Sequence, residues 1–179
     1  GYISIGFDHF AKPQDELARA LHEKKLHRNF QGYCTRESTG QVYAFGSSGI
    51  TQLSHSFFQN NKNYIEYNKA IQNNGFATTM GHIRSHNEFL INTMIEMILC
   101  NNIIDWETVA MHCNLSSDYV RDFFSFSKTK ITELLADGLL QKESYGFSVT
   151  KIGTFFSRNI AAAFDPALLT SNKLFSSSI

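Results

Sequence analysis

The stretch SHNEFLINTMIEMIL, residues 85–99, decides the fold of this 179-residue chain. Ser85 is a good N-cap residue and Glu88 follows three positions later, which is the spacing of a capping box at the start of a helix. Apolar residues then follow at helical spacing. They are Phe89, Leu90, Met94, Ile95, Met97, Ile98 and Leu99. The stretch therefore predicts a strongly apolar helix.

The residues after this helix predict further helices and a β-ribbon. Asp105 can cap a short helix that runs through Ala110, and Asp118 precedes a longer amphipathic helix. The amphipathic helix carries Val120, Phe123, Phe124 and Phe126, and another helix runs from about Lys128 to Asp137-Gly138. Two strands, 139–142 and 147–150, flank the turn 143–146. A last helix runs from about Lys151 to Phe164. This order is typical of a winged-helix-like arrangement.

The residues before the apolar helix predict a mixture of strands and helices. Tyr2, Ile3 and Ile5 indicate a strand that ends at Gly6, and residues 14–24 indicate a short surface helix. The predicted strand 42–45 is followed by the small residues 46–49, which could approach a ligand closely or simply turn the chain. A helix is predicted from Asn60 to about Ile71, and residues 73–75 end it.

Two tracts mix hydrogen-bonding side chains with aromatic ones. They are FDHFA, residues 7–11, and LHRNFQGY, residues 26–33. A buried polar group without a partner costs about 1–3 kcal/mol, so a segment built only for packing keeps its polar groups on one face. We interpret the two tracts together as parts of a site. For any single residue, a satisfied structural hydrogen bond remains the alternative.

Composition limits the class of protein. Lys plus Arg and Asp plus Glu both number 16, so no overall charge favours nucleic acid or an anionic membrane. No apolar stretch approaches the ~20 residues of a membrane span, and no signal peptide pattern opens the chain. We expect a cytoplasmic monomer that binds neither nucleic acid nor membrane. The start without Met, inside a predicted strand, indicates a fragment.

The cysteines and histidines do not indicate a metal site. Cys34, Cys100 and Cys113 are spaced unlike zinc or iron–sulfur ligands. His82 and His86 lie four residues apart, but His86 opens the predicted helix, so the two should not share a helical face. We expect Cys100 in the core and both histidines in solvent.

Seven segments, taken in order, resemble the oxygen-independent coproporphyrinogen III oxidases, which are radical S-adenosylmethionine enzymes. They are GFDHFAKPQDELA, LHRNFQGY, FGSSGIT, RSHNEFLINTMIEMILCNN, LLADGLL, FSVTKIG and RNIAAAFD, and residues 175–179 look like a variant of that family's C-terminus. The resemblance implies an α+β fold. Residues 1–60 would supply the last strand or strands and loops of an incomplete barrel, and 61–80 a connecting helix or linker. Residues 81–179 would form a helical C-terminal domain with a winged-helix-like β-ribbon that covers the active site.

The resemblance also implies a reaction, the oxidative decarboxylation of two propionates of coproporphyrinogen III to the vinyl groups of protoporphyrinogen IX in heme biosynthesis. The full-length enzyme would use S-adenosylmethionine and a [4Fe-4S] cluster. The family's CxxxCxxC cluster motif is absent from this sequence, so the fragment alone should be inactive.

The same resemblance assigns candidate residues to the site. Ile50 matches a position that contacts S-adenosylmethionine, and Phe30 and Gln31 match the neighbourhood of a second S-adenosylmethionine or the substrate. Arg28 could hold a propionate, and Asp8 with His9 could move a proton or orient a carboxylate. The alternative is that these last three residues brace the final strand.

Departures from the family keep other functions open. Relatives commonly carry arginines where this chain has Ile91-Asn92, Ile103 and the serines 176–178. Fewer cations leave the substrate in question, so a heme- or tetrapyrrole-binding paralogue also fits. A winged-helix interaction or nucleic-acid-binding module is the other alternative, although its basic footprint is weak. A CxxxCxxC motif upstream in the parent gene would favour the enzyme.

Overall fold

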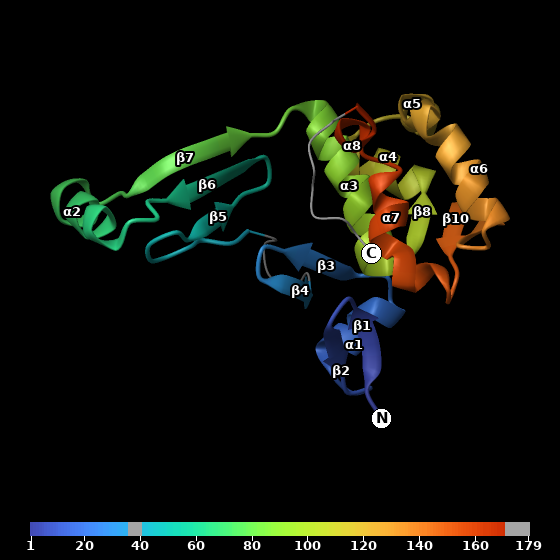
Figure 1. The fold of residues 1–179 in the computed structure, drawn as a ribbon, viewed down its shortest axis with the longest axis horizontal. Coiled ribbons are helices and arrows are strands. Elements are labelled where there is room, and N and C mark those ends of the chain that lie inside the picture. The colour runs from blue at the N-terminus through green and yellow to red at the C-terminus, as the bar shows by residue number, and fades with distance from the viewer. Residues whose placement is uncertain (36–40, 171–179) are drawn as a thin grey trace.

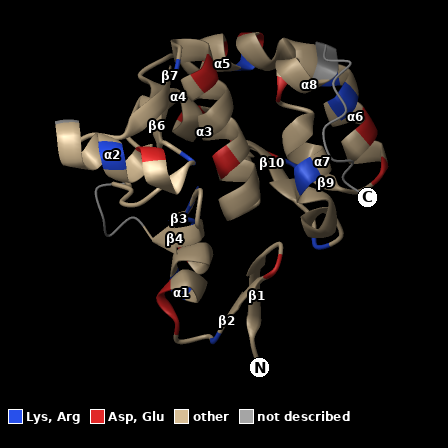
Figure 2. Ribbon diagram, turned by 60° about the vertical axis from the view of Figure 1, so that its left-hand side comes forward, with Lys and Arg blue, Asp and Glu red and all other residues tan. Residues whose placement is uncertain are grey.

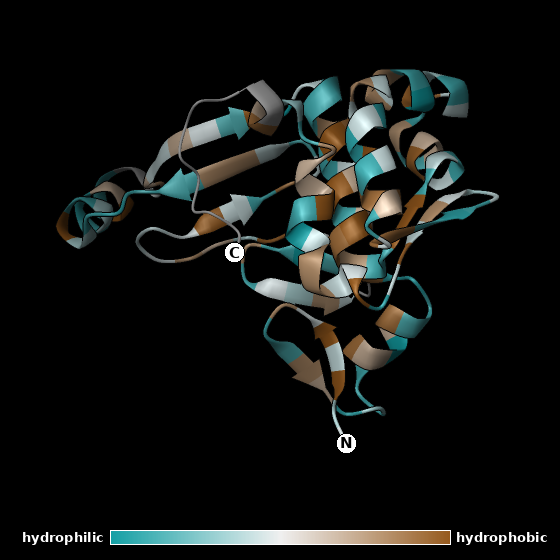
Figure 3. Ribbon diagram, turned by 45° about the vertical axis from the view of Figure 1, so that its right-hand side comes forward, coloured by the Kyte–Doolittle hydropathy of each residue, from teal (hydrophilic) through white to brown (hydrophobic). Residues whose placement is uncertain are grey.

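The computed structural model describes residues 1–35 and 41–170. Helix α3 (His86–Asn101) forms the left side of a helical unit in Figure 1. The predicted capping box is confirmed, because the Ser85 hydroxyl accepts from the Glu88 N–H and the Glu88 carboxylate accepts from the Ser85 N–H. Leu90, Met94 and Ile98 are fully buried. Figure 3 shows hydrophobic residues, in brown, along the packed helices of this unit. The predicted apolar helix is thus the centre of the main core.

The helical unit surrounds this core with helices and one small sheet. Trp106, Phe124 and Phe164 pack against one another in it. Strands β8 (Ile103–Asp105), β10 (Gly146–Val149) and β9 (Leu140–Glu143) form the antiparallel sheet, in that order. The elements are β8 (Ile103–Asp105), α4 (Trp106–Cys113), α5 (Ser117–Phe123), the 3-10 helix η1 (Phe124–Ser127), α6 (Lys128–Ala136), β9 (Leu140–Glu143), β10 (Gly146–Val149), the 3-10 helix η2 (Gly153–Phe156), α7 (Ser157–Ala162) and α8 (Pro166–Thr170).

Three details of this unit differ from the prediction. The helix predicted after Asp118 begins at Ser117, with Ser116 as its N-cap, and gives way to a 3-10 helix at Phe124. The β-ribbon carries a third strand, because β8 pairs with β10 and places Ile104 opposite Phe147. The last α-helix begins at Ser157 and not near Lys151. The Gly153 N–H donates to the Thr150 hydroxyl, so the chain makes a tight turn and a 3-10 helix before α7.

A three-stranded antiparallel sheet extends away from the helical unit and carries a helix at its far end (Figure 1). We call residues 41–84 the arm. Its elements are β5 (Ile50–Gln52), β6 (Ser56–Asn60), α2 (Tyr64–Asn74) and β7 (Thr78–Ile83). The predicted helix is confirmed, although it begins at Tyr64 after the N-cap Asn63, and Gly75 caps its end at φ +73°.

The strand predicted over residues 42–45 was wrong. Val42 makes an isolated bridge to Gln52, and the residues after it are irregular. The Ala44 N–H donates to the Thr51 hydroxyl, so a side chain takes the donor that a strand would have paired with backbone. The strand next to the small residues is β5, which follows them.

A hairpin and a short helix, residues 3–22, lie below the helical unit in Figure 1, and a second hairpin, residues 26–35, lies to the left of its lower end. The predicted first strand and surface helix are both confirmed. A second, smaller core joins Ile5, Leu26 and Tyr33 to Cys100 of α3, and Cys100 is buried as expected. The elements are β1 (Ile3–Gly6), β2 (His9–Ala11), α1 (Glu16–His22), β3 (Leu26–Asn29) and β4 (Gly32–Thr35).

The fold is therefore mixed helix and sheet, as expected. Within residues 1–35 and 41–170 every strand pairing is antiparallel, so the barrel strand expected in residues 1–60 stays a prediction. Residues 175–179, where the sequence suggested a family C-terminus, lie outside the described residues. In the described part of the chain, no helix is long and apolar enough to cross a membrane.

Replacing Ile98 should test the central role of α3. Ile98 is 0% exposed, so Ile98→Ala should lower the free energy of unfolding by about 2–5 kcal/mol through lost burial and a cavity. Ile65 on α2 is 62% exposed, and Ile65→Ala should change stability by about 0.5 kcal/mol or less. Urea denaturation measures both, and similar losses in the two variants would contradict this account of the core.

Candidate functional site

The two hairpins β1–β2 and β3–β4 approach each other through glycines. A Cβ on Gly6 would lie 2.2 Å from the Tyr33 hydroxyl oxygen, and one on Gly32 would lie 2.7 Å from His9 Nε2. Both glycines also have φ values, +157° and +139°, that side-chain-bearing residues rarely adopt. Each hairpin thus presents a bare backbone to a ring of the other, and this brings the two polar-aromatic tracts together.

Arg28 and the ring of Phe7 form the centre of the cluster that results. The Arg28 guanidinium carbon lies 4.5 Å from the ring centroid of Phe7 and 5.4 Å from that of Tyr33. His9 packs edge-on against Tyr33, with 5.1 Å between centroids. The carboxylate of Asp8 lies 3.0 Å from His9 Nδ1. We call these five residues the Phe7 cluster.

The charges of the Phe7 cluster are only partly paired. A backbone hydrogen bond, and then the hydrogen bond with His9, lower the pKa of Asp8. The Asp8 carboxylate is 90% exposed and makes no ion pair with Arg28. The fold brings the candidate catalytic residues Asp8, His9 and Arg28 together. Asp8 pairs with His9, so the Arg28 guanidinium has no carboxylate partner among the described residues.

Tyr33 connects the Phe7 cluster to α3. Its ring is buried, and its hydroxyl donates to the carbonyl oxygen of Leu99 at 3.3 Å. Burial raises the pKa of Tyr33 to about 12, because the phenolate would lose its hydration. The phenol is therefore a neutral hydrogen-bond donor that holds the second hairpin on the helix.

The other face of β3 is fastened to the C-terminal half of α3. His27 Nδ1 lies 2.6 Å from the Glu96 carboxylate. The Asn101 amide accepts from the Leu26 N–H at 3.2 Å and donates to the Leu26 carbonyl at 3.3 Å. Lys24 donates to the backbone carbonyl of Asn101 at 2.7 Å. These contacts fix where the hairpin and its tip lie.

The tip of the second hairpin carries Phe30 and Gln31. The Asn29 side-chain oxygen accepts from the N–H groups of Gln31 and Gly32, at 2.8 and 3.2 Å, and so shapes the turn. Phe30 is 60% exposed, and Gln31 is exposed as well. The Phe30 ring packs edge-on against Phe57 of the arm, with 5.3 Å between centroids.

Ile50 lies close to this contact on the arm. It is the first residue of β5, where Gln52 pairs with Phe57 and Ile50 pairs with Gln59. Paired residues and residues two apart share a face of a sheet, so Ile50 and Phe57 are diagonal neighbours, at about 7–8 Å. Phe57 therefore links the two sequence-predicted positions Phe30 and Ile50.

Arg84 holds the arm to α3. Its guanidinium carbon lies 4.9 Å from the ring centroid of Phe57 and 5.2 Å from that of Phe89. It also donates to the carbonyl of Ser54, and burial lowers its pKa. The role of Arg84 is not apparent from the sequence, because one of its ring partners, Phe57, comes from a different strand of the arm.

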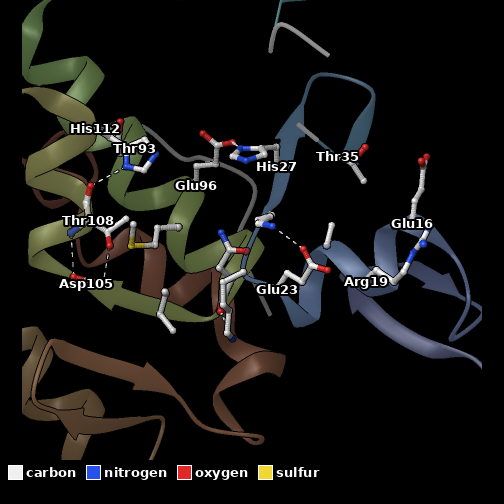
Figure 4. A pocket seen from close by; sticks show the side chains of 16 residues that line it. Glu16, Arg19, Glu23, His27, Thr35, Thr93, Glu96, Asp105, Thr108 and His112 are labelled. Atoms are coloured by element: carbon white, nitrogen blue, oxygen red, sulfur yellow. Dashed lines mark hydrogen bonds and ion pairs between the residues drawn. The ribbon is translucent and has the colours of Figure 1, made fainter. Parts of the chain in front are cut away.

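A cavity of about 820 Å³ lies elsewhere, between α1 and β3 on one side and α3 and α4 on the other (Figure 4). Its charged lining is largely paired within the chain. Figure 4 shows His27 and Glu96 pointing toward each other, and Asp105 accepts from the N–H groups of Glu107 and Thr108. None of the six site residues predicted from sequence lines this cavity.

The described ranges 1–35 and 41–170 contain no cluster of His, Cys, Asp or Glu that could hold a metal ion. His82 and His86 are exposed, as expected, and lie on β7 and α3. Acidic and basic residues are interspersed over the helical unit in Figure 2. Lys130 pairs with Glu133 at 2.8 Å.

The buried phenol of Tyr33 predicts a pH dependence. Its pKa is about 12 in the folded chain against an ordinary 10.0, so the unfolded chain ionises first as pH rises. Its contribution to stability is complete below pH 10 and is lost as pH rises through about 12. In Tyr33→Phe the free energy of unfolding should fall less steeply over this range.

The variant should also lose about 0.5–1.5 kcal/mol at neutral pH, because the hydrogen bond to Leu99 is gone. Tyr119→Phe is a matched control, since that ring is 47% exposed, and should leave the stability at neutral pH close to that of the wild type. Urea denaturation at a series of pH values measures the slopes. Equal slopes in wild type and Tyr33→Phe would show that Tyr33 does not titrate abnormally.

The chain is similar to several curated proteins named oxygen-independent coproporphyrinogen III oxidase. It is 35% identical to the one from Synechocystis sp. over 97% of this chain and 37% of the relative. It is 33% identical to the Escherichia coli protein, over 94% and 36%, and 36% identical to the Thermostichus vulcanus protein, over 94% and 51%. No family model matches the chain.

A solved structure agrees with these relatives. It is coproporphyrinogen III oxidase from Escherichia coli, described as a radical SAM enzyme, and it matches with a TM-score of 0.84 at 33% identity. The match covers 93% of this chain and 37% of that one. In sequence and in fold, the chain is similar to the oxygen-independent coproporphyrinogen III oxidases, and it spans between about a third and a half of the length of these relatives.

Proposed function

We propose that the chain is part of an oxygen-independent coproporphyrinogen III oxidase and supplies a wall of its cofactor and substrate site. The homology along nearly the whole chain carries this proposal. The reaction is the oxidative decarboxylation of two propionates of coproporphyrinogen III to vinyl groups. The chain would contribute binding and positioning to that reaction.

Phe30, Gln31 and Ile50 suit S-adenosylmethionine. Phe30 offers an exposed ring face for stacking on a base, and Gln31 offers an exposed amide that both donates and accepts. Ile50 adds an aliphatic surface on the neighbouring strand. Because Phe57 contacts Phe30 and neighbours Ile50, these groups can face one bound molecule.

The [4Fe-4S] cluster fits less well within this part of the chain, because residues 1–35 and 41–170 contain no ligand cluster for a metal. We therefore assign its ligands to residues outside these ranges. Bound to the cluster, S-adenosylmethionine supplies radical chemistry to the whole enzyme. The isolated chain should accordingly show no turnover.

The Phe7 cluster suits substrate positioning better than proton transfer. His9 Nδ1 contacts Asp8, and His9 Nε2 packs against Gly32, so both ring nitrogens are engaged or covered. The Arg28 guanidinium stacks on Phe7 and has no carboxylate partner among the described residues. We propose that Arg28 binds a propionate and that the Asp8–His9 pair braces the hairpin beside it.

The finer architecture is also proposed. We infer that residues 1–60 supply the last strand or strands and loops of an incomplete barrel. Residues 61–80 would connect this part to residues 81–179, which would form a helical domain with a winged-helix-like unit that covers the active site. The order α3, β8, α4, α5–α6, β9, β10 supports the winged-helix part. We propose that the protein is a monomer. We also propose that it does not bind nucleic acid, because Lys130 of α6 is paired with Glu133 and is not free to contact a phosphate.

A chimera tests the proposed function. The chain would replace the matching part of the Escherichia coli oxidase, and the purified protein would be assayed anaerobically with S-adenosylmethionine and coproporphyrinogen III for vinyl product. Product is expected. A chimera that shows the visible absorbance of the cluster but forms no product would contradict the proposal.

Gln31 is tested within the same chimera. Gln31→Ala should lower turnover about fivefold, because losing one hydrogen bond costs about 1 kcal/mol. Gln72→Ala removes an exposed amide on α2 and should leave turnover unchanged. Equal turnover in both variants would remove Gln31 from the site.

A further inference from the structure

Arg158 lies in the segment RNIAAAFD, one of the seven segments that resemble the family, and has no role in the site described so far. It is on α7, whose residues Ser157, Ile160 and Ala161 are buried in the helical unit. These neighbours fix the backbone of Arg158, while its own side chain is exposed. Its guanidinium carbon lies 4.5 Å from the ring centroid of Phe7.

Two cations therefore meet at one ring. The guanidinium carbons of Arg28 and Arg158 each lie 4.5 Å from the centroid of Phe7, so they are at most twice that distance apart. Neither side chain makes an ion pair or a hydrogen bond with any described residue. Asp8, the nearby acid, contacts His9 and stays in solvent.

The backbone of Phe7 supports a special role for this ring. Its φ is +47°, which is uncommon for a bulky aromatic residue and costs conformational free energy. The conformation holds the ring against both arginines. Stacking uses the flat face of a guanidinium and leaves its N–H edge available, and that edge matches the two oxygens of a carboxylate.

We propose that Arg28 and Arg158 together bind a carboxylate of the tetrapyrrole substrate, with Phe7 as the platform that aligns them. This inference rests on the proposed function for its ligand, and it adds Arg158 from the helical unit to a site otherwise built by the hairpins. An anion between the two guanidinium groups would also relieve their mutual repulsion. The substrate would thus bridge β3 and α7.

Porphyrin binding to this chain tests the proposal. The probe is coproporphyrin III, the stable oxidised form of the substrate, titrated against the chain by its fluorescence. Arg158→Gln should weaken binding at least tenfold. Arg158→Lys should recover part of the loss, because lysine restores the positive charge but cannot donate to both carboxylate oxygens as a guanidinium does. Coproporphyrin tetramethyl ester, which has no free carboxylate, should bind wild type and Arg158→Gln alike.

Arg121→Gln is the matched control. Arg121 also places its guanidinium on a ring, 5.6 Å from the centroid of Trp106, but on α5. This variant should bind coproporphyrin III as wild type does. Thermal unfolding midpoints of all variants show whether Arg158→Gln is folded.

Three outcomes would overturn the proposal: equal affinity of Arg158→Gln and wild type for coproporphyrin III, equal loss of affinity for the acid and the ester, or no binding of the acid by the wild-type chain. The second outcome would make Arg158 a structural brace. An inactive chimera combined with Arg158-dependent binding would contradict the proposed enzyme while leaving this carboxylate site in place. An active chimera with unchanged Arg158→Gln binding would contradict the carboxylate site alone.

Discussion

The side chains of α3 belong to two hydrophobic cores at once. Leu90, Met94 and Ile98 are buried among the helices of the larger core. Cys100, at the end of the same helix, is buried in the smaller core with Leu26 and Tyr33. Because a helix of this length is stiff, the two cores cannot move independently. The positions of α7 and of both hairpins therefore depend on how α3 packs.

Hydrogen bonds at the C-terminal end of α3 fix the position of β3 against the helix. The Asn101 amide satisfies both backbone groups of Leu26, as a neighbouring strand would. Losing such a partner would cost about 1–3 kcal/mol, since these groups are buried. The polar groups of β3 that face α3 are therefore satisfied. The Arg28 guanidinium, two residues further along the strand, makes no hydrogen bond or ion pair with the described residues, so it stays available to a ligand.

Local signals in the sequence predicted the local elements. The capping box at Ser85 and the stops at Gly75 and Gly138 each act within one turn of their helix, so they could be read without a structure. Strand β8 could not be predicted, because three residues carry no periodic pattern and its pairing with β10 decides it. The error at residues 42–45 has a similar cause, since Thr51 takes a backbone donor there.

The candidate site shows the same limit. Asp8, His9 and Arg28 lie together as their mixture of polar and aromatic neighbours suggested. Arg158 and Arg84 were missed because the rings they contact, Phe7 and Phe57, come from distant parts of the chain. A cation on a ring has no sequence spacing of its own. Only the folded chain could reveal these pairs.

The support beneath the Phe30 ring suits it to a ligand at the hairpin tip. Exposure alone does not single this ring out, because Phe45, Phe76 and Phe155 are 93%, 82% and 86% exposed. Phe30 is 60% exposed even though it contacts Phe57, and the Asn29 side chain holds the turn that presents it. Phe57 in turn is held by Arg84, which is anchored on α3 through Phe89. A rigidly supported but uncovered ring is suited to contact a bound molecule.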